Sequence, residues 1–507
     1  MRGIYLICLL TFLVFGTPAQ AAPVIDEAGA QELQQSLEKL YNWYSEVAVS
    51  AGEGLIMSGG VDVKPNGDFY VAKITGLSIV VDHGYRFDIG TATYHIMPSS
   101  TPDVWLVSMT LPPKIVMYDS KDRAEISFHL GEQKSAALWH AKDDLWPKYD
   151  VTFNNINIAS YDGSFKTAIK ELRFTMDLKQ DPDGNWSGPS NFTINGIHLS
   201  GQGKNSGLVL KIANIVSNTS YKSLVLNDLE TLRTEIKELL GAMQGDTKLQ
   251  KKVRKLIAKA ARNEYSDAQD IVSDLKMKGL TANLIYGKAG VSRRHNIELK
   301  NLETSVSALN MRNNTGQIDW SLGMNGFTIS DLPPGIDPGL IPHQAQINVN
   351  LSNLPITEIA ERAGMFIAFI GMGSSKDEAD NEAKQFIAVD LPAILAKAGS
   401  GLTVKNTFIA APNISGQANV ELSAQAQPPY AAGTARVTLG GIDELITQLR
   451  QSGLAQGKDL QGLAGIQIAG QLQQDKNGRS MRIYDFKINP DGTILLNGVD
   501  MSMMGKR

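Results

Sequence analysis

Short runs of alternating apolar and polar residues, broken by turn-forming residues, dominate this chain. Such runs fill residues 46–220, with 69–71 (Phe-Tyr-Val) as one example, and the texture returns over 277–354. Residues 65–67 (Pro-Asn-Gly) and 181–184 (Asp-Pro-Asp-Gly) separate runs, and these residue types favour tight turns in which glycine takes a positive φ. A period of two predicts β-strands with one buried face. The sequence therefore predicts a meandering antiparallel sheet.

Helical periodicity is confined to a few segments. Leu33, Leu37 and Leu40 repeat at helical spacing within residues 29–44, which predicts a first helix. The other predicted helices lie within residues 224–275, 356–371, 376–398 and 441–452. Because helices follow runs of strands and do not alternate singly with them, the pattern argues against a parallel α/β sheet. We expect an α+β fold, in which long, curved, mostly antiparallel sheets are covered by these helices.

The same patterns divide the chain into successive parts. We expect a signal peptide at 1–21, an N-terminal helix and first β region at 22–223, a helical insert at 224–275, a second β region at 276–355, a helical segment at 356–400, and a C-terminal β-rich region with a final hairpin at 401–507. Residues 195–197 (Asn-Gly-Ile) and 325–327 (Asn-Gly-Phe) give the two β regions a similar cadence. A duplicated β unit explains this similarity, and so does the preference of tight turns for Asn-Gly. Both interpretations stay open.

The first 21 residues are typical of a cleavable secretory signal peptide. Arg2 provides the positive charge, and an apolar stretch from Ile4 to Phe15 follows. That stretch is shorter than the roughly 20 residues that a membrane-spanning helix needs. Small residues at Ala19 and Ala21 predict cleavage before Ala22. We therefore expect a periplasmic or secreted protein with no integral membrane span after cleavage.

Composition excludes several classes of function. The single cysteine, Cys8, lies inside the predicted signal peptide, so the mature chain is expected to have no disulfide and no thiolate chemistry. The formal net charge is −4, which gives no global basic field for nucleic acid. Stability must then come from the burial of apolar side chains.

Catalytic and metal-binding motifs are missing from the sequence. None of the seven histidines pairs with another histidine or a carboxylate in a recognised zinc spacing. No G-x-S-x-G or phosphate-binding loop occurs. The acidic run at 377–382 lacks the calcium-loop pattern and falls at the start of a predicted helix, where negative charge complements the helix dipole. We predict a protein that is not an enzyme and has no cofactor or metal site.

A basic helix predicted over residues 247–263 is one candidate binding surface. Its cations follow a helical spacing and line one face: Lys248, Lys252, Lys255, Lys259 and Arg262. A basic amphipathic helix can lie on anionic lipid head groups or bind an acidic partner. The alternative is a packed helix whose lysine face is simply solvated.

The most apolar segment of the mature chain, residues 365–372, is a second candidate. Its large side chains are Met365, Phe366, Phe369 and Met372. The segment is too short to span a membrane. It is either a helix buried between layers or the lining of an apolar groove, in which methionines adapt to varied acyl chains.

Several short motifs resemble a known group of sequences. They are residues 58–63 (Ser-Gly-Gly-Val-Asp-Val), 67–71, 89–90, 111–112, 186–189 (Trp-Ser-Gly-Pro), 489–492 and 497–499. With them the chain resembles secreted β-rich bacterial families of unknown function, of an alphaproteobacterial type and more distantly the YdgA-like proteins. In texture it is also similar to AsmA-like and other long-groove lipid carriers. These families have no established catalytic residues, so the resemblance implies none here.

Three hypotheses about function follow. The first is a non-enzymatic periplasmic protein that binds or shields a lipid or another apolar ligand in maintenance of the cell envelope. The second is a structural or protein-interaction module of the envelope, and the third is a hydrolase whose site has no recognisable motif. The expected partners are a lipid or an envelope protein, and not nucleic acid.

Overall fold

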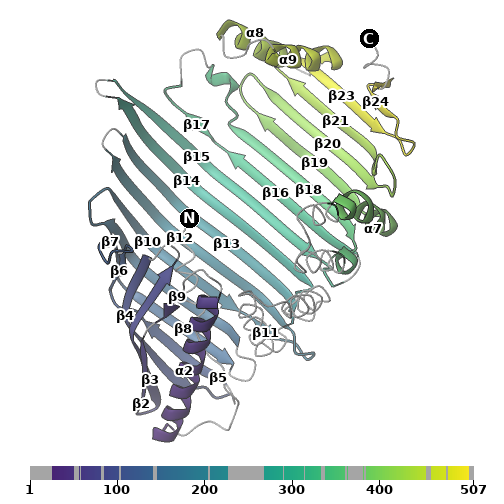
Figure 1. Ribbon diagram of the computed structural model, residues 1–507. Helices are drawn as coiled ribbons and strands as arrows, with labels where there is room; N and C mark the ends of the chain where they lie inside the picture. The colour runs from purple at the N-terminus through teal and green to yellow at the C-terminus, as the bar shows by residue number, and fades with distance from the viewer. Residues whose placement is uncertain are drawn as a thin grey trace. The chain divides into compact units, whose positions relative to one another are not determined.

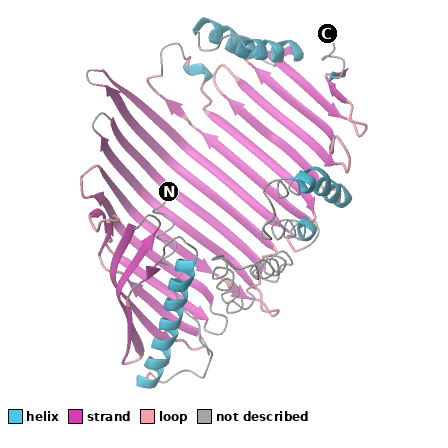
Figure 2. Cartoon of the chain, in the orientation of Figure 1, coloured by secondary structure: helices cyan, strands magenta, loops and turns pink. Residues whose placement is uncertain are grey.

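A computed structural model gives the structure of the chain, and strands dominate it (Figures 1 and 2). The residues that it describes are 25–50, 56–57, 59–81, 85–101, 104–140, 145–203, 206–225, 268–288, 291–312, 315–332, 337–359, 362, 381, 384–452, 458–474 and 478–501. They fall into two compact units: the first contains the described residues up to Gly203 together with 224–225, and the second contains 206–223 and the described residues from 268 onward.

The described part of the first unit consists of one helix followed by antiparallel strands. The helix is α2 (Glu27–Ser50). The strands are β1 (Ile56–Met57), β2 (Gly60–Asn66), β3 (Phe69–Val81), β4 (Tyr85–Pro98), β5 (Val104–Thr110), β6 (Lys114–Tyr118), β7 (Ala124–His129), β8 (Gln133–His140), β9 (Leu145–Ser160), β10 (Phe165–Asp177), β11 (Lys179–Gln180) and β12 (Trp186–Gly203). Ala30, Leu33 and Leu37 of α2 are buried, and the Asp26 amide beside the helix donates to the Tyr70 hydroxyl of β3 at 3.4 Å. The helix predicted at 29–44 is thereby confirmed.

Strands β4 to β9 pair in a closed circuit. β4 pairs with β5 and β6, β9 pairs with β8 and β7, and the circuit closes because β5 pairs with β8 and β6 with β7. Gly90 and Asn155, both at positive φ, lie where β4 and β9 change partners. At Ile96 and Trp139 the exposed fractions are 0% and 1%. The first unit therefore has a filled apolar core.

The second unit is a long antiparallel meander with short helices. Its strands are β13 (Ser206–Leu224), β14 (Asp270–Lys288), β15 (Val291–Leu309), β16 (Gly316–Asn325), β17 (Thr328–Ile329), β18 (Gln344–Leu354), β19 (Gly401–Ala410), β20 (Ser415–Ala424), β21 (Ala431–Gly440), β22 (Gln471–Gln474), β23 (Ser480–Ile488), β24 (Ile494–Leu496) and β25 (Val499–Asp500). Its helices are η2 (Pro338–Leu340), η3 (Phe386–Asp390), α7 (Leu391–Ala398), α8 (Ile442–Ser452) and α9 (Lys458–Ala469). The main strands pair in the order β13–β14–β15–β16–β18–β19–β20–β21–β23–β24. Within the described part of this unit, no pairing joins the two ends of the series, so its sheet stays unclosed.

The apolar residues of β14 change from odd to even positions at a glycine within the strand. Before Gly279 the apolar residues occupy odd positions, as in Leu275 and Met277, and after it they occupy even positions, as in Leu280 and Leu284. Gly279 has φ +63°, a conformation that residues with a Cβ avoid. Because a one-residue offset exchanges the two faces of a strand, this glycine allows both halves to direct apolar side chains to one face.

The predicted fold class was wrong, because the described part of the chain is mostly antiparallel β-sheet and not an α+β arrangement with helices layered over the sheets. The α+β prediction required helices layered over the strands, whereas strands predominate and the described helices of the second unit lie at strand ends (Figure 2). Residues 270–275, predicted as part of the helical insert, open β14 and pair with strands on both sides. Ile271 and Val272 are β-branched and favour a strand. The remainder of 224–275 and much of 356–400 lie outside the described residues.

Candidate functional site

The strands of the second unit place apolar side chains in rows that cross the sheet. Residues paired directly opposite each other in an antiparallel ladder share a face. One row is Ile271, Ala308, Ile318, Leu351, Leu402 and Leu422. The next row is Val306, Trp320, Val349, Val404, Val420, Ala435 and Phe486. We call the surface that these rows form the open face.

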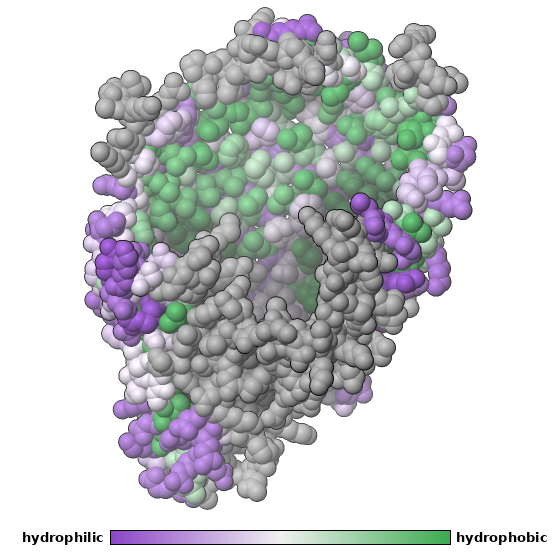
Figure 3. Space-filling view, in the orientation of Figure 1, coloured by the Kyte–Doolittle hydropathy of each residue, from purple (hydrophilic) through white to green (hydrophobic). Residues whose placement is uncertain are grey.

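Side chains of the open face are more exposed to solvent than the core side chains of the first unit. Val306 is 42% exposed and Trp320 is 37% exposed, and both sit in the middle of the meander. In the described parts of β13, β15 and β16, no hydrophobic side chain is buried. Figure 3 shows hydrophobic side chains gathered over these strands. A contiguous apolar surface of this kind indicates an interaction site.

On the opposite side of the same strands, polar side chains form hydrogen bonds with one another. Ser307 donates to one carboxylate oxygen of Asp319 at 3.1 Å, and Asn350 donates to the other at 2.5 Å. Further along this side, Arg436 makes a two-pronged ion pair with Asp485, at 2.5 and 2.8 Å. The sheet is therefore amphipathic, with its hydrogen-bonding groups on one side and its apolar rows on the other.

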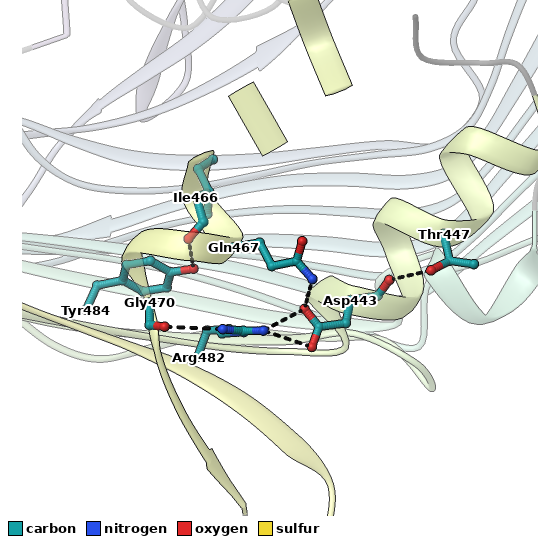
Figure 4. A network of polar contacts seen from close by, with 7 residues as sticks. All are labelled: Asp443, Thr447, Ile466, Gln467, Gly470, Arg482 and Tyr484. Atoms are coloured by element: carbon teal, nitrogen blue, oxygen red, sulfur yellow. Dashed lines mark hydrogen bonds and ion pairs between the residues drawn. The ribbon is translucent and has the colours of Figure 1, made fainter. Parts of the chain in front are cut away.

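Helices α8 and α9 are fixed to the end of β23 by a polar network (Figure 4). Arg482 of β23 contacts both carboxylate oxygens of Asp443 at 3.3 Å, and Gln467 of α9 donates to the same carboxylate at 2.6 Å. The Tyr484 hydroxyl donates to the Ile466 carbonyl at 2.7 Å. Burial raises the pKa of the Tyr484 phenol, so that it remains a neutral donor. This network covers one end of the open face, because Tyr484 lies on the same side as Phe486.

Replacement of Asp443 with asparagine is expected to destabilise the second unit. The side chains of Arg482 and Asp443 are only 17% and 32% exposed, so the variant leaves a poorly solvated guanidinium without its counter-charge. We expect the free energy of unfolding to fall by about 1–2 kcal/mol. Hydrogen exchange of peptides from α8 and β23 measures this change. Asp485→Asn, which breaks a more exposed Arg–Asp pair between β21 and β23, should cost less; an equal loss would contradict the argument from burial.

The residues that the sequence singled out as binding candidates lie outside the described residues. This holds for the basic set Lys248, Lys252, Lys255, Lys259 and Arg262, and for the apolar set Met365, Phe366, Phe369 and Met372. The signal peptide at 1–21 also lies outside them. These three assignments stay predictions.

Sequence reasoning missed the open face. The signal was present as strict alternation in residues 318–322 (Ile-Asp-Trp-Ser-Leu), which predicts a strand with one apolar face. Alternation cannot distinguish an apolar face that packs on a core from one that is left accessible, because both need the same residues.

Comparisons with known proteins gave no match: no family model, no curated protein and no solved structure matches this chain. The resemblance to secreted β-rich bacterial families therefore stays a prediction. Among the described residues, no helix is both long and apolar enough to cross a membrane. In the same part of the chain, no cluster of three or more histidine, cysteine, aspartate or glutamate side chains is arranged to hold a metal ion.

Proposed function

We propose that this protein binds or shields lipid acyl chains on the open face, without catalysis, in the periplasm. The observation that carries the proposal is the accessibility of apolar rows at the centre of the sheet, where Val306 and Trp320 face outward. The predicted signal peptide supports the compartment. The similarity in texture to long-groove lipid carriers agrees with this ligand class.

The size of the open face suits an extended apolar ligand. Its rows run across the strands from β14 to β21. Along β15, successive rows pass through Leu302, Thr304, Val306 and Ala308. With strands about 4.8 Å apart and a rise of about 3.4 Å per residue, this area measures about 30 Å by about 20 Å. That exceeds the few hundred Å² at which an exposed apolar patch on a soluble protein usually marks a binding surface.

Trp320 provides a direct test of the proposal. Lipids with brominated acyl chains quench a tryptophan only on contact, so we expect them to quench Trp320 in wild-type protein re-isolated after incubation with lipid. Trp320→Phe should remove this part of the quenching, while the tryptophans of the first unit remain. If wild type and Trp320→Phe are quenched equally, the acyl chains do not lie on the open face and the proposal fails.

A matched pair of charge insertions locates the ligand on one side of the sheet. Val306 and Ser307 are consecutive in β15 and face opposite sides. Val306→Lys places an ammonium group among the acyl chains and should weaken binding of a zwitterionic brominated lipid by more than about tenfold. Ser307→Lys places the same charge next to Asp319 and should leave binding unchanged. Equal effects from the two variants would argue against the open face.

The alternative is a protein-interaction module of the envelope, and one observation favours it. Ile468 of α9 is 82% exposed and Leu472 of β22 is 61% exposed, and neither belongs to the paired rows of the open face. Capture of an envelope protein by crosslinking from position 468, together with no quenching at Trp320, would favour this function over lipid binding.

A further inference from the structure

A hydrogen-bonded pair of polar side chains, Tyr286 and His295, lies among apolar side chains where β14 ends and β15 begins. His295 pairs in register with Leu284, and Tyr286 follows Leu284 by two residues, so all three share a face. The Tyr286 and His295 rings stack with their centroids 5.2 Å apart, and the Tyr286 hydroxyl lies 2.7 Å from His295 Nε2. Tyr286 is 46% exposed. The polar Tyr286 side chain is thus exposed to solvent beside apolar side chains.

The hydrogen bonds of this pair leave a donor available. His295 Nδ1 is buried and has no hydrogen-bond partner among the described residues. A buried N–H without a partner costs more than a bare acceptor nitrogen, which favours the tautomer with its proton on Nε2. Nε2–H then donates to the Tyr286 oxygen, and the phenol O–H is free to donate outward. Such a donor suits an oxygen acceptor, as in a phosphate or carboxylate.

The hairpin that joins β14 to β15 is cationic. Between Gly279 and Ile297 the sequence contains Lys288, Arg293 and Arg294 and no acidic residue. Arg293 pairs in register with Tyr286. The acidic residues next to this stretch are Glu298, on the opposite side of β15 from Leu299 and Ile297, and Asp331, whose carboxylate accepts from Ser330 beside Asn296. The end of the strand pair therefore favours a negative group.

An apolar track leads away from this end. Leu284, Ala282 and Leu280 follow one another on one face of β14. Their partners on β13 are also apolar, namely Leu208, Leu210 and Ile212. Two acyl chains fit beside each other across such neighbouring strands, which lie about 4.8 Å apart.

We propose that the ligand is an anionic phospholipid whose head group binds at the β14–β15 hairpin. The Tyr286 hydroxyl contacts the phosphate, and the positive charge of the hairpin, where Lys288 and Arg293 occupy register positions on the Tyr286 face, favours its negative charge. The acyl chains lie along the track that begins at Leu284. This inference rests on the proposed function and adds to it the charge of the ligand and its orientation. From His295 to Val306 is a distance of about 36 Å at 3.3 Å per residue, so a lipid bound here is separate from one in contact with Trp320.

The test places a tryptophan beside the hairpin. The full chain carrying Leu284→Trp and Trp320→Phe is incubated with phosphatidylglycerol or phosphatidylcholine that have identical brominated chains, and is then re-isolated. We expect stronger quenching of the new tryptophan by phosphatidylglycerol, and stronger quenching by bromines near the head group than by bromines near the chain end. Native mass spectrometry of the wild-type chain measures the same preference without the tryptophan substitutions.

Charge variants decide whether the hairpin causes the preference. Lys288→Gln with Arg293→Gln, both at positions on the Tyr286 face, should lower phosphatidylglycerol binding by about tenfold to thirtyfold and leave phosphatidylcholine binding unchanged. Lys405→Gln with Lys487→Gln removes the same charge from the polar side and should change neither. Equal binding of the two lipids to wild type, or no effect of the Lys288 and Arg293 substitutions, would overturn this inference while quenching at Trp320 still supports the proposed function. No quenching at Trp320 by either lipid would instead reject the proposed function.

Discussion

Replacement of Trp139 with alanine is expected to lower the free energy of unfolding of the first unit by about 3–5 kcal/mol. Trp139 is 1% exposed and lies inside the closed circuit of β4 to β9. Its ring stacks between those of Trp105 and Trp146, at centroid distances of 6.4 and 6.3 Å. Removal of the indole leaves a cavity that a closed ring of paired strands cannot easily collapse to fill.

Trp320→Ala is the matched control for that prediction. It removes the same side chain from the open face, where 37% of Trp320 is already exposed, so less apolar area returns to water and no enclosed cavity forms. Hydrogen exchange, followed peptide by peptide, separates the two units. We expect faster exchange in β8 and β9 of Trp139→Ala and a smaller change in β15 and β16 of Trp320→Ala. Equal losses in the two variants would show that the second sheet is packed as tightly as the first.

Local sequence signals predicted the elements better than their assembly. The helix at 29–44 was predicted from leucine spacing and corresponds to α2, and the final hairpin was predicted from residues 482–488 and 493–499 and corresponds to β23 to β25. Both depend on contacts between residues close in sequence. The α+β class depended instead on what covers an apolar face, which alternation within a strand does not encode.

The candidate site was hidden for a related reason. Each of its strands reads as an ordinary half-buried strand, and only the register shows that Val306, Trp320 and Val349 form one row. The Tyr286–His295 pair likewise depends on register, since the two residues lie nine positions apart, on strands joined by a turn. Position 279 conceals the pattern further, because the apolar residues of β14 change from odd to even positions there. If one uniform alternation is assumed along β14, half of the strand is assigned to the wrong face.

Replacement of Gly279 with valine is therefore expected to disrupt both the stability and the apolar face of β14. Gly279 has φ +63°, and a Cβ at this position lies 2.9 Å from the Cβ of Ala213 on β13. The left-handed backbone and the overlap together should cost about 2–5 kcal/mol. If β14 instead relaxes to an extended conformation, the residues after position 279 exchange faces, and Leu280, Ala282 and Leu284 turn to the polar side.

Gly67→Val separates these two contributions. Gly67 has nearly the same φ, +64°, but no atom lies within 4 Å of its Cβ position, so this variant bears only the backbone cost of about 1–2 kcal/mol. Hydrogen exchange of residues 280–288 and of residues 60–75 measures the two losses. We expect a larger loss in Gly279→Val, together with loss of lipid quenching at a tryptophan placed at position 284. If the two losses are equal and quenching survives, Gly279 is an ordinary turn glycine, and the continuity of the apolar face across β14 has another cause.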